Sequence, residues 1–261
     1  MQLPIYQVDA FTNTMFSGNP AAVVLLDEWL PDKILTSIAA ENNLAETAYV
    51  VTRGDVLPLR WFTPTVEVDL CGHATLASAH VIFKYVLPAA NSVTFSTRSG
   101  NLIVARDGGL LSMDFPVRPG EPVPITDALV AALGIRPTEV YLARDLLGVF
   151  ESEAQIRDFQ PDFQHIASVD AFAVIISAPG DAVDYVYRFF APRQGIPEDP
   201  ATGSAHCTLV PYWTNRLGKI DLSARQLSAR GGEVHCRLRG DRVLIAGHAV
   251  EYLRGEITVE I

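Results

Sequence analysis

The sequence predicts an α/β (α+β) protein of two pseudo-symmetric halves, each combining a mostly antiparallel or mixed sheet with one buried helix. The main observation is a motif that occurs twice. Arg60-Trp61-Phe62-Thr63-Pro64 leads to Gly72, and Arg188-Phe189-Phe190-Ala191-Pro192 leads to Gly203. The two arginines lie close to half the chain length apart, as an internal repeat requires. A second observation is that each glycine opens an apolar stretch of helical length, whereas most of the remaining chain has strand patterns.

The composition limits the classes of protein to consider. A chain of 261 residues, 49% hydrophobic and 19% charged, is long for one core and suits two domains, which we place at 1–116 and 117–261. The last strand is able to cross back to the first half. A net charge of −10 argues against a nucleic-acid partner, and no apolar run is long enough to span a membrane. The N-terminus lacks signal-peptide features, and three cysteines fit a reducing cytoplasm, where we expect the protein.

In the first half, strands are predicted at 5–11 and 20–26, with the turn Ser17-Gly18-Asn19-Pro20 between them. A helix follows from Pro31 to Asn42-Asn43, residues that tolerate the left-handed conformation of a helix end. Residues 44–51 and 57–62 are the next strands. The central helix of this half, about 73–86, is apolar on nearly all sides, so the strands should wrap around it. Hairpins at 92–115 complete the half.

Four prolines between Pro116 and Pro124 mark a linker to the second half. There, Thr126 is the expected N-cap and Gly134 the expected end of a short helix. Strands are predicted at 140–143, 147–150, 171–177 and 183–190, with a poorly defined helix near 153–159. The central helix, about 204–217, contains Pro211, which should kink it. Strands fill the remainder, with a hairpin turn at Arg239-Gly240-Asp241.

Glu46 is the most informative single residue. It shares the apolar face of its strand with Leu44, Ala48 and Val50, if the strand alternates. Burial of a carboxyl group raises its pKa towards neutrality, as a general acid or base requires. The alternative is a structural ion pair with an arginine such as Arg60.

Both predicted helix starts carry polar residues. The dipole at the start of the first helix should keep His73 neutral, and its free N–H groups suit a carboxylate ligand. Asp199 and Ser204 flank Gly203 in the second motif. Taken singly, each of these side chains is also an ordinary helix cap, and His73 an ordinary core histidine. It is the presence of two such loops that favours a binding cleft.

Other kinds of site find no support. The sequence lacks the glycine-rich fingerprints of nucleotide sites and the Cys and His spacings of metal sites, so we predict no cofactor and no metal. A triad of Ser204, His73 and Asp199 lacks the Gly-x-Ser-x-Gly elbow of a hydrolase.

Four ordered motifs resemble the phenazine-biosynthesis PhzF-like family, across a match from about residue 5 to the end of the chain. They are Ser17-Gly18-Asn19-Pro20, Asn43-Leu44-Ala45-Glu46-Thr47-Ala48, Cys71-Gly72-His73-Ala74-Thr75 and Asp199-Pro200-Ala201-Thr202-Gly203-Ser204-Ala205. The resemblance implies a diaminopimelate-epimerase-like fold, with each sheet curled around its central helix and the active site between the domains. It also implies a cofactor-independent isomerase of a small carboxylate-bearing metabolite, acting as a homodimer.

The resemblance further implies roles for individual residues. Glu46 matches the proton-shuttling glutamate, His73, Asp199 and Ser204 match its polar partners, and Gly72 and Gly203 match the helix-start glycines. Ala45 replaces a hydroxyl residue of some members, which puts the substrate contact there in question. Two alternatives stay open. One is an amino-acid racemase or epimerase with Glu46 and Cys71 as opposed bases, and the other is a non-catalytic binding protein of the same fold.

Overall fold

The computed structural model of the protein describes residues 1–260, which form two compact units. The first unit runs from Met1 to Asp114 and resumes at Ala246, and the second runs from Phe115 to Ile245. The chain therefore leaves the first unit once and returns to it. Our sequence division placed all of 117–261 in the second half, apart from a last strand able to cross back. The segment that begins at Ala246 belongs to the first unit.

The first unit is a mixed sheet. Its strands pair in the order β18-β1-β2-β3-β4-β6-β7-β8, with the short β5 beside the end of β4. Two of these pairings, β2 with β3 and β4 with β6, are parallel, and the others are antiparallel. The strand bounds are Gln2–Ala10 (β1), Asn19–Leu26 (β2), Glu46–Val51 (β3), Val56–Phe62 (β4), Glu67–Val68 (β5), Ser92–Thr97 (β6), Gly100–Asp107 (β7), Leu110–Pro116 (β8) and Ala249–Thr258 (β18).

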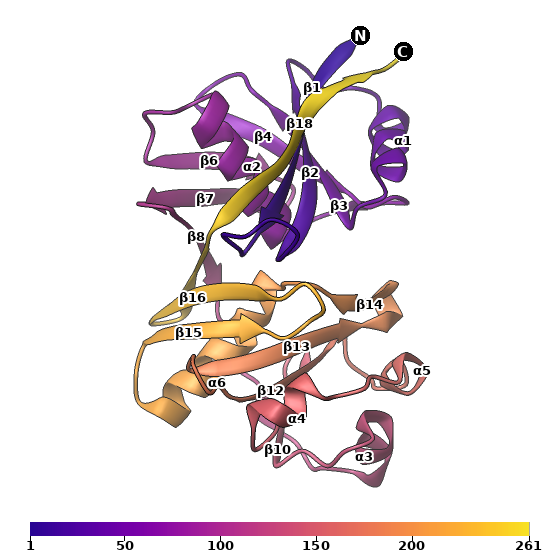
Figure 1. The fold of residues 1–261 in the computed structure, drawn as a ribbon, viewed down its shortest axis with the longest axis vertical. Coiled ribbons are helices and arrows are strands. Elements are labelled where there is room, and N and C mark those ends of the chain that lie inside the picture. Colours follow the sequence, from indigo (N-terminus) through magenta and orange to yellow (C-terminus); the bar gives the residue numbers. More distant parts are fainter. Residues whose placement is uncertain (261) are drawn as a thin grey trace. The chain divides into compact units, whose positions relative to one another are not determined.

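Two helices cover opposite faces of this sheet (Figure 1). Helix α1, Asp32–Asn42, packs Leu35 and Ile38 into a core that includes Tyr49 and Val51 of β3. Helix α2, Gly72–Tyr85, packs against β1, β2, β3 and β18, and ten of its residues are buried. Because side chains alternate along a strand, Glu46 points to the face that α2 covers. The apolar circumference of α2 thus fits its central place in the unit.

The second unit repeats the mixed pattern. Its strands pair in the order β9-β10-β11-β12-β13-β15-β16, with β14 beside the end of β13. Here β11 with β12 and β13 with β15 are the parallel pairs. The strand bounds are Glu121–Pro122 (β9), Glu139–Leu142 (β10), Leu146–Val149 (β11), Val174–Pro179 (β12), Tyr185–Ala191 (β13), Ile196–Asp199 (β14), Asp221–Gln226 (β15) and Gly232–Arg239 (β16). Strand β17, Arg242–Gly247, runs from the second unit into the first.

Helices again lie against the sheet. The central helix α6, His206–Leu217, packs against β15 and β16, and α4, Glu153–Arg157, packs against β12 and β13. Helices α3, Asp127–Leu133, and α5, Phe163–Ile166, pack against each other and join the apolar core of α4, β12 and β13. Two short 3₁₀ turns, η1 at Pro192–Gln194 and η2 at Gly203–Ala205, complete the unit.

The repeat in the sequence is a repeat in the topology. The order β4, β5, α2, β6 in the first unit corresponds to β13, β14, α6, β15 in the second. In each, the first strand pairs antiparallel with the short one and parallel with the last. The repeated arginine has the same partner type in both. Arg60 binds Glu67 of β5 through two hydrogen bonds of 2.7 Å, and Arg188 binds Glu198 of β14 through bonds of 2.7 and 2.9 Å. A bidentate Arg–carboxylate pair fixes both distance and orientation, so each holds the loop before its central helix.

Local predictions of the helix ends are confirmed. Asn43 ends α1 with a φ of 50°, and Gly134 ends α3 in the left-handed region. Thr126 caps α3 by accepting a hydrogen bond from the Leu129 N–H. The start of the second central helix is corrected, because residues 203–205 form the 3₁₀ turn η2 and the α-helix begins at His206.

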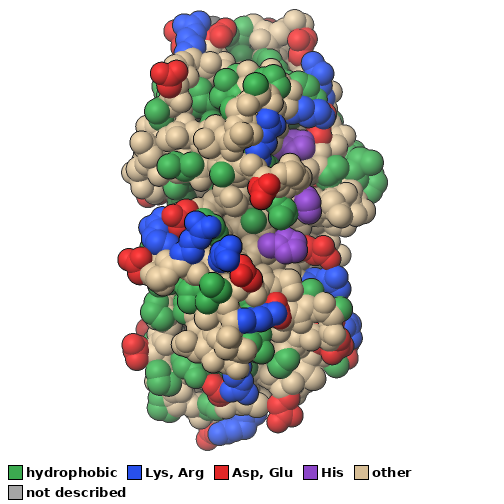
Figure 2. Space-filling view, turned by 90° about the vertical axis from the view of Figure 1, so that its left-hand side faces the viewer, with side chains coloured by type: hydrophobic (Ala, Val, Ile, Leu, Met, Phe, Trp, Pro, Cys, Tyr) green, Lys and Arg blue, Asp and Glu red, His purple; other side chains and the backbone are tan. Residues whose placement is uncertain are grey.

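On the face seen in Figure 2, basic and acidic side chains lie interspersed. None of the helices within residues 1–260 has the length and apolar character needed to cross a bilayer.

Candidate functional site

Glu46 begins β3 and is buried under α2. Its side chain is only 11% exposed, and every residue of β3 is buried. Its partner is His73, whose Nε2 lies 3.2 Å from Oε2 of Glu46. The contact lacks hydrogen-bond geometry, so among the described residues no donor is aligned on this oxygen. Burying a carboxylate with an unfilled lone pair is costly, and such atoms call for a functional explanation.

The alternative partner for Glu46 is excluded. Arg60 binds Glu67, and its NH1 also lies 2.9 Å from Asp32. Glu46 is therefore paired with a titratable imidazole instead of with a permanently charged guanidinium.

Cys71 completes this cluster at the start of α2. It is the N-cap residue, and its Sγ lies 3.5 Å from Nδ1 and 4.0 Å from Nε2 of His73. All three side chains of Glu46, Cys71 and His73 are buried. The fold brings them together because β3 passes beneath the first turn of α2.

The protonation states differ from our sequence-based expectation. Burial favours a raised pKa for Glu46, but the positive charge of His73 outweighs it, and the pKa is lowered from 4.5. For His73 the balance is reversed. Burial favours a lowered pKa, but the negative charges of an ionised Cys71 and of Glu46 raise the pKa well above 6.5. Burial raises the pKa of the Cys71 thiol to about 11, so this thiol is uncharged near neutrality. Glu46 is then the anion that keeps the proton on His73.

Two of our expectations are thus wrong in sign. A raised pKa for Glu46 and a neutral His73 followed from considering burial and the helix dipole one residue at a time. The two groups form a carboxylate–imidazolium pair, which neither argument includes.

The first turn of α2 leaves backbone donors available. Cys71 makes no side-chain capping hydrogen bond, and the first hydrogen bond of the turn runs from the Thr75 N–H to the Cys71 carbonyl. A Cβ at Gly72 would meet nothing within 4 Å. Ala45, just before β3, is exposed. Open space beside uncapped amides at a helix N-terminus suits an anion such as a carboxylate.

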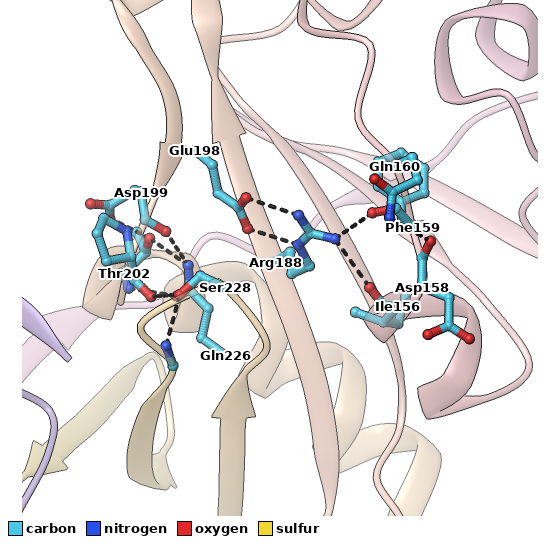
Figure 3. A network of polar contacts seen from close by, with 12 residues as sticks. Ile156, Asp158, Phe159, Gln160, Arg188, Glu198, Asp199, Thr202, Gln226 and Ser228 are labelled. Carbon is cyan, nitrogen blue, oxygen red and sulfur yellow. Dashed lines mark hydrogen bonds and ion pairs between the residues drawn. The ribbon is translucent and has the colours of Figure 1, made fainter. Parts of the chain in front are cut away.

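In the second unit, Asp199 belongs to a loop that other side chains hold in place (Figure 3). The Thr202 hydroxyl donates to the Asp199 carboxylate. The fully buried Gln226, at the end of β15, accepts from the Thr202 N–H at 2.7 Å and donates to the Asp199 carbonyl. Ser228 donates to the Pro200 carbonyl at 2.6 Å. The loop is therefore preorganised by residues outside the motif.

A buried chain of hydrogen bonds supports the same loop from behind. The Tyr187 hydroxyl donates to the Thr202 carbonyl at 3.3 Å, so its oxygen accepts from Nε2 of His206 at 2.9 Å. Nδ1 of His206 must then accept from the Tyr185 hydroxyl at 2.7 Å. Burial lowers the pKa of His206 to about 3, so the ring is neutral at all ordinary pH values and its hydrogen bonds select this tautomer.

Gly203 and Ser204 follow this loop in the turn η2. Gly203 is buried and Ser204 is half-buried. The Ser204 hydroxyl has no hydrogen-bond partner among the described residues. The structure thus groups Glu46 with His73 in one unit, and Asp199 with Gly203 and Ser204 in the other.

Several contributing residues escaped the sequence reasoning. Gln226, His206 and Tyr187 have no motif of their own, and only a polar residue within an apolar pattern hints at them. Glu67 and Glu198, the partners of the repeated arginines, each follow their arginine by one short loop (Figure 3 shows the pair of the second unit).

The fold is shared with an epimerase-like solved structure. A solved structure described as a predicted epimerase from Pseudomonas aeruginosa has a TM-score of 0.74 at 20% identity, over 99% of this chain and 100% of that one. This likeness concerns the fold alone.

Sequence comparison gives the family. The chain matches the PhzC–PhzF family, described as phenazine biosynthesis-like protein, over residues 8–255, and it belongs to that family. A solved PhzF-family structure from Enterococcus faecalis has a TM-score of 0.97 at 45% identity, over 99% of this chain and 100% of that one. A Pseudomonas aeruginosa relative named an uncharacterized isomerase is 51% identical over 258 residues, covering 98% of this chain and 99% of the relative. The predicted family and fold class are confirmed.

Proposed function

We propose that the protein is a cofactor-independent isomerase, in which Glu46 moves a proton between two carbons of a small carboxylate-bearing metabolite. Relatives named isomerases, 51% and 49% identical over nearly the whole chain, support the reaction class. The substrate and the proton transfer itself are our inference from the residues.

The observation that carries the proposal is the state of Glu46. Its carboxylate is buried, ionised, and paired with a residue that itself exchanges protons. Oε2 has a lone pair that no described donor fills. A purely structural carboxylate would be satisfied by its partners, as Glu67 is by Arg60. An unsatisfied carboxylate is free to accept a proton from a substrate carbon.

In this mechanism, Glu46 removes a proton from one carbon and returns it to another on the same face of the substrate. The imidazolium of His73 stabilises the carboxylate before transfer, and it can stabilise negative charge that develops on the substrate as the C–H bond breaks. The amides at Gly72 would bind the substrate carboxylate.

We further propose that Asp199 and Ser204 are substrate-binding residues. Asp199 would bind an amine or hydroxyl of the substrate, and the Ser204 hydroxyl and the amides after Gly203 would hold a second polar group. The rigid support of this loop by Gln226 favours such a role, because binding then costs little ordering of the loop. Homodimeric assembly and a cytoplasmic location stay predictions.

The racemase alternative fits the geometry less well. Two bases that invert a carbon stand on opposite sides of it, each about 3–3.5 Å away, and so roughly 6–7 Å apart. The reactive atoms of Glu46 and Cys71 lie within 4.8 Å of one another. With a pKa of about 11, the Cys71 thiol is also a poor source of thiolate near neutrality.

The test is incorporation of solvent deuterium into a panel of cyclic and acyclic amino acids and related acids. An isomerase exchanges a carbon-bound proton and shifts a double bond without inverting a stereocentre. A racemase exchanges and inverts, and a binding protein does neither. Exchange in the wild type that is absent in Glu46→Gln supports the proposal. Inversion of a stereocentre, or equal exchange in both proteins, contradicts it.

A further inference from the structure

The first unit brings together three side chains that are all metal ligands in proteins. Glu46 offers a carboxylate oxygen, Cys71 a sulfur and His73 a ring nitrogen, and these atoms all lie within 4.8 Å of one another. Glu46 comes from β3 and the other two from the start of α2. The long gap in sequence explains why the chain shows no metal-binding spacing.

The separations approach those of a tetrahedral zinc site. With usual bond lengths to zinc, the nitrogen and oxygen ligands lie about 3.4 Å apart, and the sulfur and nitrogen ligands about 3.5 Å apart. Nε2 of His73 is 3.2 Å from Oε2 of Glu46 and 4.0 Å from Sγ of Cys71. Both separations from Nε2 are thus within about half an ångström of the tetrahedral values, a difference within the reach of side-chain rotation.

One ligand atom of the cluster also lacks an aligned hydrogen-bond donor. Oε2 of Glu46 is buried and no described donor is aligned on it. A divalent cation that replaced the protons of Cys71 and His73 would face a thiolate, a carboxylate and a neutral imidazole. Two negative charges then balance the ion, which suits a buried site.

We propose that Glu46, Cys71 and His73 form a three-ligand site for Zn²⁺ and that the bound metal blocks proton transfer by Glu46. The thiolate selects zinc and similar borderline or soft ions over Mg²⁺ and Ca²⁺, which prefer oxygen ligands. The fourth coordination position would hold water or a group of the ligand. Zinc here is an inhibitor and not a cofactor, because it occupies the lone pair that the proposed isomerase needs.

Metal binding at this cluster does not depend on the isomerase function, whereas inhibition by the metal rests on the proposed function. The experiment therefore measures binding without turnover. Co²⁺, which adopts the same tetrahedral geometry as Zn²⁺, is titrated into the purified protein, and absorption is recorded. One equivalent of Co²⁺ should give a thiolate-to-cobalt charge-transfer band with tetrahedral visible bands, and Zn²⁺ should remove both. Mg²⁺ in excess should leave them unchanged.

Matched variants locate the site. Cys71→Ala should abolish the charge-transfer band. Glu46→Gln should weaken Co²⁺ binding by at least about 10-fold, since loss of even an outer-shell partner of a metal ligand costs that much. Cys207→Ala, which removes a buried cysteine of the second unit, should bind as the wild type does. Cys71→Ser, with circular dichroism to confirm folding, separates loss of the sulfur from loss of the fold.

Metal binding and inhibition are tested by separate results. No charge-transfer band in the wild type, or an equal band in Cys71→Ala, overturns the metal site. If Co²⁺ binds as described, Zn²⁺ at concentrations that saturate the site should stop deuterium exchange, and a chelator should restore it. Exchange that continues at full rate in the zinc-loaded protein overturns the inhibition. Absence of exchange without metal, on any compound, would contradict the isomerase while leaving the cobalt spectra to judge the site.

Discussion

Replacing Glu46 by glutamine tests the proposed proton transfer most directly. Glutamine keeps the shape of the side chain but cannot accept a proton from carbon. A positioned acid–base group contributes about 10²-fold or more to rate, which corresponds to about 2.7 kcal/mol at 1.36 kcal/mol for each factor of ten. We therefore expect exchange in Glu46→Gln to fall by at least about 10²-fold, while ligand binding persists.

The same change should reverse the effect of His73 on stability. In the wild type, the pKa of His73 is raised, so its contribution to stability is present below the unfolded value of 6.5 and is lost as pH rises through the folded pKa. Without Glu46, burial dominates and the folded pKa falls below 6.5. Stability is then lost as pH falls through 6.5, by up to about 1.4 kcal/mol per pH unit for one proton. The free energy of unfolding of Glu46→Gln should therefore lie further below the wild-type value at about pH 5.5 than at about pH 9.

Glu153→Gln is the matched control. The side chain of Glu153 is 8% exposed, against 11% for Glu46, but it pairs with Arg157 in the second unit. This control should exchange deuterium as the wild type does. Exchange is followed by proton NMR on the compound that the panel identifies, the pKa of His73 by its imidazole signals, and stability by urea denaturation at both pH values. Exchange in Glu46→Gln within a few-fold of wild type, or an unshifted His73 pKa, would refute the reasoning.

Three further changes test the surroundings. Cys71→Ala should keep most of the activity and cost little stability, because a thiol with a pKa of about 11 takes no proton near neutrality; a loss of several orders of magnitude in turnover would favour the racemase instead. Gly72→Ala should leave the melting temperature unchanged or higher, since alanine favours a helix more than glycine does and its Cβ meets nothing within 4 Å. The methyl group should crowd the helix start and raise the KM, and an unchanged KM would remove this terminus from the substrate site. Gln226→Leu leaves the buried Thr202 N–H unpaired, so the free energy of unfolding measured in urea should fall by about 1–3 kcal/mol, and ligand binding should weaken. Wild-type stability would show that the Asp199 loop does not depend on Gln226.

Local patterns in the sequence predicted the elements that depend on local physics. The apolar circumference of α2 predicted a buried central helix, and Asn43 and Gly134 marked helix ends through their backbone preferences. The repeated arginine motif anticipated the repeated topology. Glu46 stands out in the sequence because a carboxylate on an apolar strand face conflicts with burial, and the structure does bury it.

Predictions failed where the outcome depends on a distant partner. The pKa shifts of Glu46 and His73 have the opposite sign to our expectation because each residue sets the charge state of the other. The residues beside Glu46 in the sequence do not include His73, and those beside His73 do not include Glu46. Gln226 likewise supports the Asp199 loop from a strand more than twenty residues further along the chain. Such contacts follow from the tertiary fold, whereas periodicity and capping report only on neighbours along the chain.

The return of the chain to the first unit has a consequence for how the protein is made. Strand β1 pairs along its length with β18, which the ribosome produces only after the whole of the second unit. The second unit is continuous in sequence, so it can fold as soon as it emerges. The first unit must wait, with one edge of β1 exposed and able to pair with other chains. Burial of α2 under that sheet, and with it the assembly of Glu46 and His73, is completed last, so a truncated chain would lack the finished Glu46–His73 pair.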